Sequence, residues 1–112
     1  NLKTHAQVLP LTGVYITRTY DAESARQWNS ITNIGYRPTF DGRELSLETF
    51  LLDPLEPPPP ARIRVEFLRR VREERRFESP DALKAQILRD ASRAQVYFRR
   101  VKSQSKSQLR SV

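Results

Sequence analysis

The segment IRVEFLRRVREERRFESPDALKAQILRDASRAQVYF, residues 63–98, contains two different hydrophobic periods in succession. Near its start, Ile63, Val65 and Phe67 alternate with charged residues, which is the two-residue period of a half-buried strand. From residue 83 onward the apolar residues recur at spacings of three and four, which is typical of an amphipathic helix. The segment therefore predicts a strand, an arginine-rich connection and a helix that packs on a sheet.

The start of this helix is marked by three successive residues. Ser79 is a preferred N-cap, Pro80 suits the first helical position, and Asp81 complements the positive end of the helix dipole. The apolar stripe then consists of Leu83, Ile87, Ala91, Ala94, Phe98 and Val101. Beyond Lys102 the period is lost, so we expect a folded domain over residues 1–101 and a frayed polar tail over 102–112.

Three further strand candidates precede this segment. Residues 13–20 (GVYITRTY), 28–34 (WNSITNI) and 46–53 (SLETFLLD) are rich in β-branched and aromatic residues, and Gly35 and Pro38 are expected to end the second of them. The proline run 57–60 cannot donate to a sheet and predicts a surface connection. Several short strands followed by one helix favour a small antiparallel barrel or sandwich with the helix packed against it.

Composition narrows the possible classes of protein. The chain of 112 residues is one domain by length, and its hydrophobic fraction of 38% supports a folded core. The absence of cysteine excludes disulfides and thiol nucleophiles. No apolar run approaches the roughly 18 residues of a membrane span, and no signal peptide is visible. We therefore expect a soluble, cytoplasmic domain without a membrane partner.

Positive charge is concentrated in the second half. Residues 1–60 carry five Lys/Arg against seven Asp/Glu (−2), and residues 61–112 carry fifteen against six (+9). Such a half can attract a phosphorylated ligand, a nucleic acid or an acidic partner, or can simply be a solvated face. The arginine-rich run 69–76 has only Phe77 nearby as a stacking platform, which argues against nucleic-acid binding.

Glu48 is the first candidate for chemistry. In a strand it shares a face with Phe50 and Leu52, and we expect the loss of hydration there to raise its proton affinity and make it a candidate general base. The structural alternative is a glutamate near a strand end that pairs with an arginine. The stretch 33–40 (NIGYRPTF) is the second candidate, because Gly35 allows close approach of another group.

Taken in order, five segments resemble one known family. They are LPLTGVY (9–15), NIGYRPTF (33–40), LETFLLD (47–53), RIRVEFLRRVREERRFES (62–79) and DALKAQILRDASRAQVYF (81–98). They closely resemble the riboflavin kinase domain that forms the carboxyl-terminal half of bacterial bifunctional FAD synthetases. The resemblance implies a mainly β fold, a six-stranded antiparallel Greek-key barrel with a C-terminal α-helix. It also implies phosphorylation of riboflavin to FMN with ATP as co-substrate and Mg²⁺ as the usual ion.

The resemblance also implies roles for individual residues. By this resemblance Glu48 is expected to be the catalytic base, and residues of the loop around 70–77 and of the helix start are expected to bind riboflavin. The implied riboflavin-binding residues are Arg70, Glu73, Arg75, Phe77 and Leu83, the nucleotide-binding residues are Asn33, Gly35 and Arg37, and the metal ligand is Asn1. An FMN adenylyltransferase domain is the expected N-terminal partner in the parent chain.

Three features depart from the family pattern. Family members carry a G-x-P-T-A-N segment whose Thr and Asn bind metal and phosphates, and Asn1 resembles its last residue. The implied Thr lies outside the chain, so we expect the fragment to phosphorylate poorly or not at all. The run Pro57–Pro60 replaces a turn, and Phe50 stands where His is frequent. A non-catalytic barrel that binds flavin or a partner, and a basic nucleic-acid-binding domain, are the alternative hypotheses.

Overall fold

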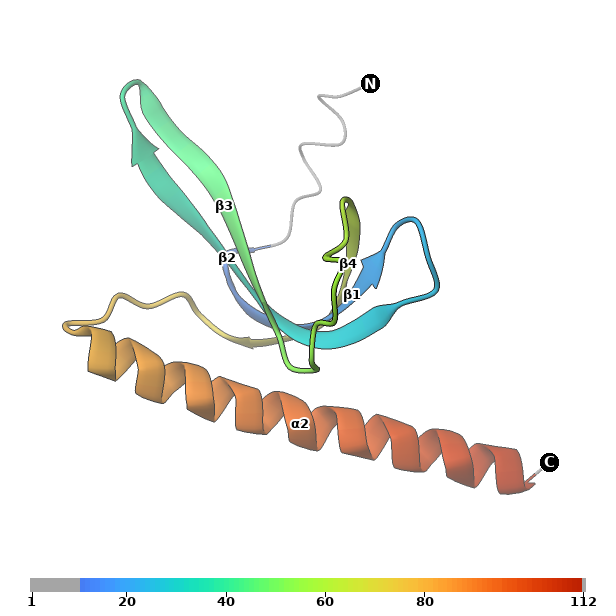
Figure 1. The fold of residues 1–112 in the computed structure, drawn as a ribbon. Helices are drawn as coiled ribbons and strands as arrows, with labels where there is room; N and C mark the ends of the chain where they lie inside the picture. Colours follow the sequence, from blue (N-terminus) through green and yellow to red (C-terminus); the bar gives the residue numbers. More distant parts are fainter. Residues whose placement is uncertain (1–10, 112) are drawn as a thin grey trace.

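The protein is a curved antiparallel sheet with one long helix beneath it (Figure 1). A computed structural model describes residues 11–111, with side chains on the helix up to residue 103. The strands are β1 (Gly13–Asp21), β2 (Gln27–Thr39), β3 (Gly42–Leu51) and β4 (Ile63–Arg72), and the helix is α2 (Pro80–Ser111). The sheet order is β3-β2-β1-β4.

The expected six-stranded closed barrel is corrected to an open sheet of four strands over residues 11–111. The four strand-like segments of the sequence correspond to the four strands, and the expectation of six came from the family resemblance. The link between β3 and β4 contains Pro57–Pro60, whose nitrogens carry no hydrogen for a ladder bond, so this link adds no strand.

β2 is longer than its sequence predicts. It runs through Gly35 and Pro38 to Thr39, and its last residues pair only with β3, in the register Pro38↔Arg43 and Thr39↔Gly42. Pairing with β1 stops at Ile34↔Gly13. Beyond that point β2 has a neighbour on one side only, so the missing N–H of Pro38 is tolerated.

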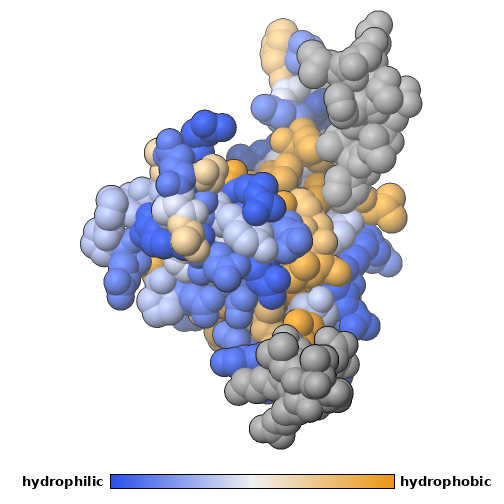
Figure 2. All heavy atoms as spheres, turned by 90° about the vertical axis from the view of Figure 1, so that its right-hand side faces the viewer, coloured by the Kyte–Doolittle hydropathy of each residue, from blue (hydrophilic) through white to orange (hydrophobic). Residues whose placement is uncertain are grey.

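The two faces of the sheet have different characters. On the helix side Val14, Ile16 and Ile31 pack against Ala94 and Phe98 of α2. The residues of the other face that alternate with them form a buried ladder of hydroxyl groups. Its contacts are Thr17–Ser30 at 2.7 Å, Thr17–Thr32 at 2.9 Å, Thr19–Ser30 at 2.8 Å and Thr32–Thr49 at 2.9 Å. Figure 2 shows apolar side chains gathered in a band beside a mainly hydrophilic surface.

The helix begins as the sequence predicts and ends later. Ser79 caps it, because its Oγ accepts a hydrogen bond from the Ala82 N–H at 3.1 Å. The predicted stripe is buried at its centre, where Ala94 and Phe98 lie, whereas Leu83 and Val101 at its ends are exposed. The helix continues to Ser111, which corrects the expected fraying after Lys102. Among the described residues no helix is long and apolar enough to cross a membrane.

Candidate functional site

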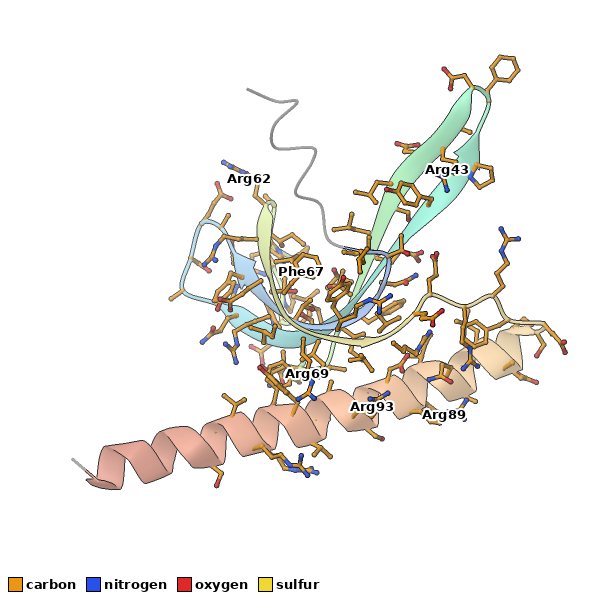
Figure 3. The ribbon with its side chains drawn as sticks, turned by 180° about the vertical axis from the view of Figure 1, so that it is seen from behind. Arg43, Arg62, Phe67, Arg69, Arg89 and Arg93 are labelled. Carbon is orange, nitrogen blue, oxygen red and sulfur yellow. The ribbon has the colours of Figure 1, made fainter. Side chains whose placement is uncertain are left out.

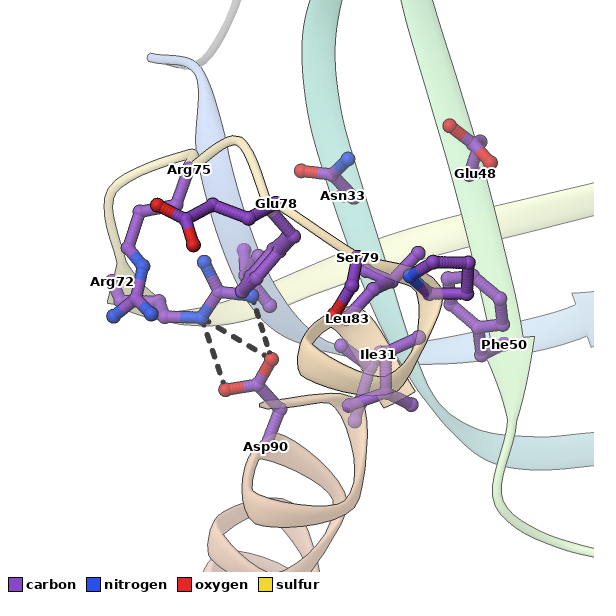
Figure 4. Close-up of a pocket in the computed structure, with 14 residues that line it drawn as sticks. Ile31, Asn33, Glu48, Phe50, Arg72, Arg75, Glu78, Ser79, Leu83 and Asp90 are labelled. Carbon is purple, nitrogen blue, oxygen red and sulfur yellow. Dashed lines mark hydrogen bonds and ion pairs between the residues drawn. The ribbon is translucent and has the colours of Figure 1, made fainter. Parts of the chain in front are cut away.

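A cavity of about 530 Å³ lies between the helix side of the sheet, the loop after β4 and the first turns of α2. Its volume lies within the range of sites for small organic ligands. Its sheet wall comprises Val14, Ile31, Asn33, Glu48 and Phe50. Its opposite wall comprises residues 75 and 77–80 of the loop and helix start, together with Leu83 and Ile87 (Figure 4).

Glu48 and Asn33 form the polar part of the sheet wall. The two residues are direct partners across β2 and β3, so their side chains leave the same face of the sheet. Asn33 Oδ1 is buried and has no hydrogen-bond partner among the described residues. A buried acceptor without a partner is uncommon in native proteins, and here it lies at a cavity that can hold a donor.

Glu48 is more hydrated than its sequence context predicts. Its side chain is 51% exposed and its Oε1 lies 3.4 Å from Arg37 Nη2, whose side chain is also largely exposed. The expectation of a poorly hydrated carboxylate is therefore corrected, and the arginine pair of the structural alternative is present. The reason is that Glu48 lies on the edge strand β3, which has no neighbour on its outer side among the described strands.

A buried ion pair between Arg72 and Asp90 forms part of the cavity wall. Arg72 Nη2 donates to Asp90 Oδ2 at 2.8 Å and Arg72 Nε donates to both Asp90 oxygens, at 3.1 and 3.2 Å (Figure 4). Gln86 Nε2 also donates to Asp90 Oδ1, at 3.0 Å. Arg72 Nη1 donates to the Glu73 carbonyl, and its guanidinium lies 5.9 Å from the centre of the Phe77 ring. The pair thus joins the end of β4, the loop and α2.

Most of the predicted riboflavin-binding residues reach the cavity. Arg75, Phe77 and Leu83 line it, and the guanidinium of Arg75 lies 5.3 Å from the centre of the Phe77 ring. Arg70 does not line it, because its side chain donates to the Thr12 carbonyl at 2.8 and 3.3 Å. Glu73 is exposed and does not line it either.

Only one of the three predicted nucleotide-binding residues lines the cavity. Asn33 lines the cavity, whereas Gly35 and Arg37 do not. An added Cβ at Gly35 would meet only the end of the Glu74 side chain, so the Glu74 carboxylate lies directly against the backbone of β2 at this glycine. Asn1, the predicted metal ligand, lies outside the described residues.

Arg72 and Asp90 line the cavity as well, and neither was predicted from the sequence as a site residue. A signal was available for Asp90, because it lies between Ile87 and Ala91, inside the apolar stripe of the helix. A carboxylate at such a position is seldom buried without a partner, and it therefore predicts a cation from a packed element.

Comparison of the sequence with known proteins identifies the family of the chain. A family model described as riboflavin kinase matches residues 1–98. The chain belongs to the riboflavin kinase family. Curated relatives are bifunctional riboflavin kinase/FMN adenylyltransferases, from Haemophilus influenzae (36% identical, 88% of this chain and 32% of the relative), from Escherichia coli K12 (37%, 88% and 31%) and from Bacillus subtilis (35%, 84% and 30%). The chain spans about a third of the length of these relatives.

The fold also matches a solved structure. A crystal structure described as a macrolide-efflux protein from Streptococcus pneumoniae has a TM-score of 0.67 and 25% identity, over 78% of this chain and 28% of that one. This likeness supports the mainly β architecture with its C-terminal helix. The riboflavin kinase family supports the assignment of the chain to an enzyme family of transferases.

Proposed function

We propose that this domain binds riboflavin in the 530 Å³ cavity and transfers the γ-phosphoryl group of ATP to it, giving FMN and ADP. One observation carries the proposal in a chain of this family. Glu48 and the unpartnered Asn33 Oδ1 lie side by side at a cavity whose remaining walls are largely apolar. A flat apolar ring system matches the apolar walls, and a polyol arm matches the two polar side chains.

In the proposed reaction the terminal ribityl oxygen attacks the γ-phosphorus, and the bond from that phosphorus to the β,γ-bridging oxygen breaks. Glu48 accepts the hydroxyl proton, so ADP leaves and FMN remains. Asn33 Oδ1 accepts a hydrogen bond from a neighbouring ribityl hydroxyl and fixes the arm. The Arg37–Glu48 pair is exposed, and such pairs contribute only about 0–1 kcal/mol, so Arg37 can exchange its partner for a nucleotide phosphate.

Mg²⁺ is proposed to bind together with the ATP phosphates. Among the described residues no group of three His, Cys, Asp or Glu side chains could hold a metal, and the predicted ligand Asn1 lies outside them. Mg²⁺ commonly keeps water ligands and binds through one or two protein groups plus substrate phosphates. The bifunctional relatives suggest that the parent protein also carries an FMN adenylyltransferase domain, which would consume the FMN.

The binding step can be tested on the chain itself. We expect riboflavin fluorescence to be quenched on titration with the chain, and Phe77→Ala to weaken this binding about tenfold. The catalytic step is tested in a version extended upstream by the family's phosphate segment. There Glu48→Gln should remove most turnover and leave riboflavin affinity within a factor of two or three. Near-normal turnover of Glu48→Gln would exclude it as the base.

Glu44→Gln is the matched control for the base. It removes the same charge from the same strand at a residue that does not line the cavity. If the extended wild-type protein binds riboflavin and makes no FMN, the domain is a flavin-binding module, and the catalytic part of the proposal is wrong. If the wild-type chain binds no riboflavin, the whole proposal is wrong.

A further inference from the structure

A second groove, of about 280 Å³, lies between β4 and the middle of α2. Arg69 of β4 faces Arg93 and Arg100 of α2 across it. Its apolar part comprises Ile16, Val71, Val96 and Tyr97. Arg69 pairs in register with Ile16, whose side chain belongs to the core under the helix, so Arg69 also leaves the sheet on the helix side (Figure 3).

The groove lacks a counter-ion within the described part of the chain. None of the ion pairs of the described side chains involves its three arginines. The acidic residue of β4, Glu66, already pairs with Arg18, and Asp90 of α2 is held by Arg72. The remaining carboxylate of α2, Asp81, lies twelve residues before Arg93, which is about 18 Å along the helix axis. Three arginines therefore line one groove without a carboxylate partner among the described side chains.

The spacing of Arg93 and Arg100 along α2 allows both side chains to contact one ligand. Arg93 and Arg100 are two helical turns apart, about 10.5 Å along the axis. Both side chains are long enough to meet a common ligand between them. An anion in the groove would receive forked guanidinium contacts, which match phosphate oxygens in geometry.

We propose that this groove binds a phosphorylated small molecule, with its phosphoryl group between Arg69, Arg93 and Arg100. Its organic part lies against Tyr97 and the neighbouring valines. The volume lies just below the range of about 300–1,000 Å³ typical of ligand pockets, so it fits a ligand of sugar-phosphate size and is too small for a whole dinucleotide. The site is separate from the riboflavin cavity, and the two sites share no lining residue.

The test is calorimetric titration of the chain with ribose 5-phosphate, inorganic phosphate and a short polyglutamate peptide, each at 50 and 200 mM salt. We expect one ribose 5-phosphate per chain, weaker binding at the higher salt, and weaker binding of inorganic phosphate, because phosphate lacks an organic part. Arg93→Gln combined with Arg100→Gln should weaken ribose 5-phosphate binding by at least tenfold. Riboflavin binding should not change in this variant.

The charge-matched control is Arg62→Gln combined with Arg64→Gln. Arg64 lies near the start of β4 and Arg62 just before it, both outside the groove, so the control should bind ribose 5-phosphate like wild type. The proposal is overturned if both double variants lose affinity equally, since the binding would then reflect net charge alone. It is also overturned if wild type binds polyglutamate but not ribose 5-phosphate, because the groove would then be a docking surface for an acidic protein segment. Absence of binding by all three probes overturns it as well.

Discussion

Removing the carboxylate of Asp90 should strongly destabilise the domain. Asp90 is 3% exposed and accepts hydrogen bonds from Arg72 and Gln86, so Asp90→Ala leaves a guanidinium and an amide without their acceptor. Breaking a buried ion pair from one side costs about 3–5 kcal/mol. The Arg72 side chain is 15% exposed and keeps some access to water, which places the loss near 3 kcal/mol. For a domain of this size we expect Tm to fall by about 12–24 °C.

Urea denaturation followed by tryptophan fluorescence measures this effect. Trp28 is the only tryptophan, is 5% exposed and donates to the Pro54 carbonyl, so its emission reports global unfolding. Asp90→Asn should cost less than Asp90→Ala, because the amide oxygen still accepts one hydrogen bond. The double change of Asp90→Leu with Arg72→Met should lie close to wild type, because it removes both buried charges together.

The control is the more exposed pair of Arg18 and Glu66, whose Nη1 and Oε1 atoms lie 3.8 Å apart and whose side chains are 27% and 45% exposed. Glu66→Gln should cost less than about 1 kcal/mol. If Asp90→Ala also costs less than about 1 kcal/mol, with an unchanged urea m-value, then the buried pair does not hold β4 to α2 and the reasoning fails. Riboflavin titration of the same variants then tests whether the pair also positions the loop that carries Phe77.

Three smaller predictions concern other parts of the sheet and helix. Hydrogen bonds from the Glu23 N–H and from Ser24, together with Arg26, hold the pKa of Asp21 below its usual range of about 3.9. Its stabilisation is complete above that pH and is lost as pH falls through the lower folded pKa, so Asp21→Asn should flatten this acid limb of a stability–pH curve. Ala94→Leu should cost about 1–3 kcal/mol in urea melts, because Ala94 is fully buried against the sheet. Gly13→Ala should cost about 1–3 kcal/mol in the same assay, because φ is +145° and an added Cβ would lie 2.6 Å from the Arg72 carbonyl.

Secondary-structure elements were predicted well where one hydrophobic period, or residues typical of a helix start, dominate the local sequence. The strands around residues 13–20 and 63–68 and the capped start of α2 follow from local pattern and match the structure. The extension of β2 past Pro38 did not follow, because tolerance of that proline depends on the sheet register: β1 begins opposite Ile34, whereas β3 pairs with β2 as far as Thr39. The pattern favoured a barrel or a sandwich and the resemblance implied a six-stranded closed barrel, but the described strands form an open sheet.

Strand alternation predicted that Glu48 and Phe50 share one face of their strand, and both line the cavity, whereas Asn33 was predicted from the family resemblance as a nucleotide-binding residue. Glu48 follows from its motif, and the register of β2 and β3 adds Asn33 directly opposite it. Arg72 and Asp90 could not be paired from the sequence, because 18 residues separate them and only the packing of α2 brings them together. The hydration of Glu48 depends on its strand being an edge, which a single strand's pattern does not reveal.

Asn33 offers a test in which stability and binding should move in opposite directions. Its buried Oδ1 has no partner in the described structure, and an unsatisfied buried group costs about 1–3 kcal/mol. Asn33→Leu removes that cost at similar volume, so the free energy of unfolding should rise by about 1 kcal/mol in urea melts. Riboflavin affinity should fall, because the proposed contact with a ribityl hydroxyl is lost. Asn29→Leu, on the same face of β2 but outside the cavity, should leave riboflavin affinity unchanged.

The opposite signs are what separate a ligand contact from a packing role. If Asn33→Leu lowered both stability and affinity, Asn33 would be a structural residue, and the fall in affinity would follow from damage to β2. If it raised stability and left affinity unchanged, the unpartnered oxygen would face a part of the cavity that riboflavin does not occupy. Only a gain in stability together with a loss of affinity fits an acceptor that β2 leaves unsatisfied in the free protein and that the substrate satisfies.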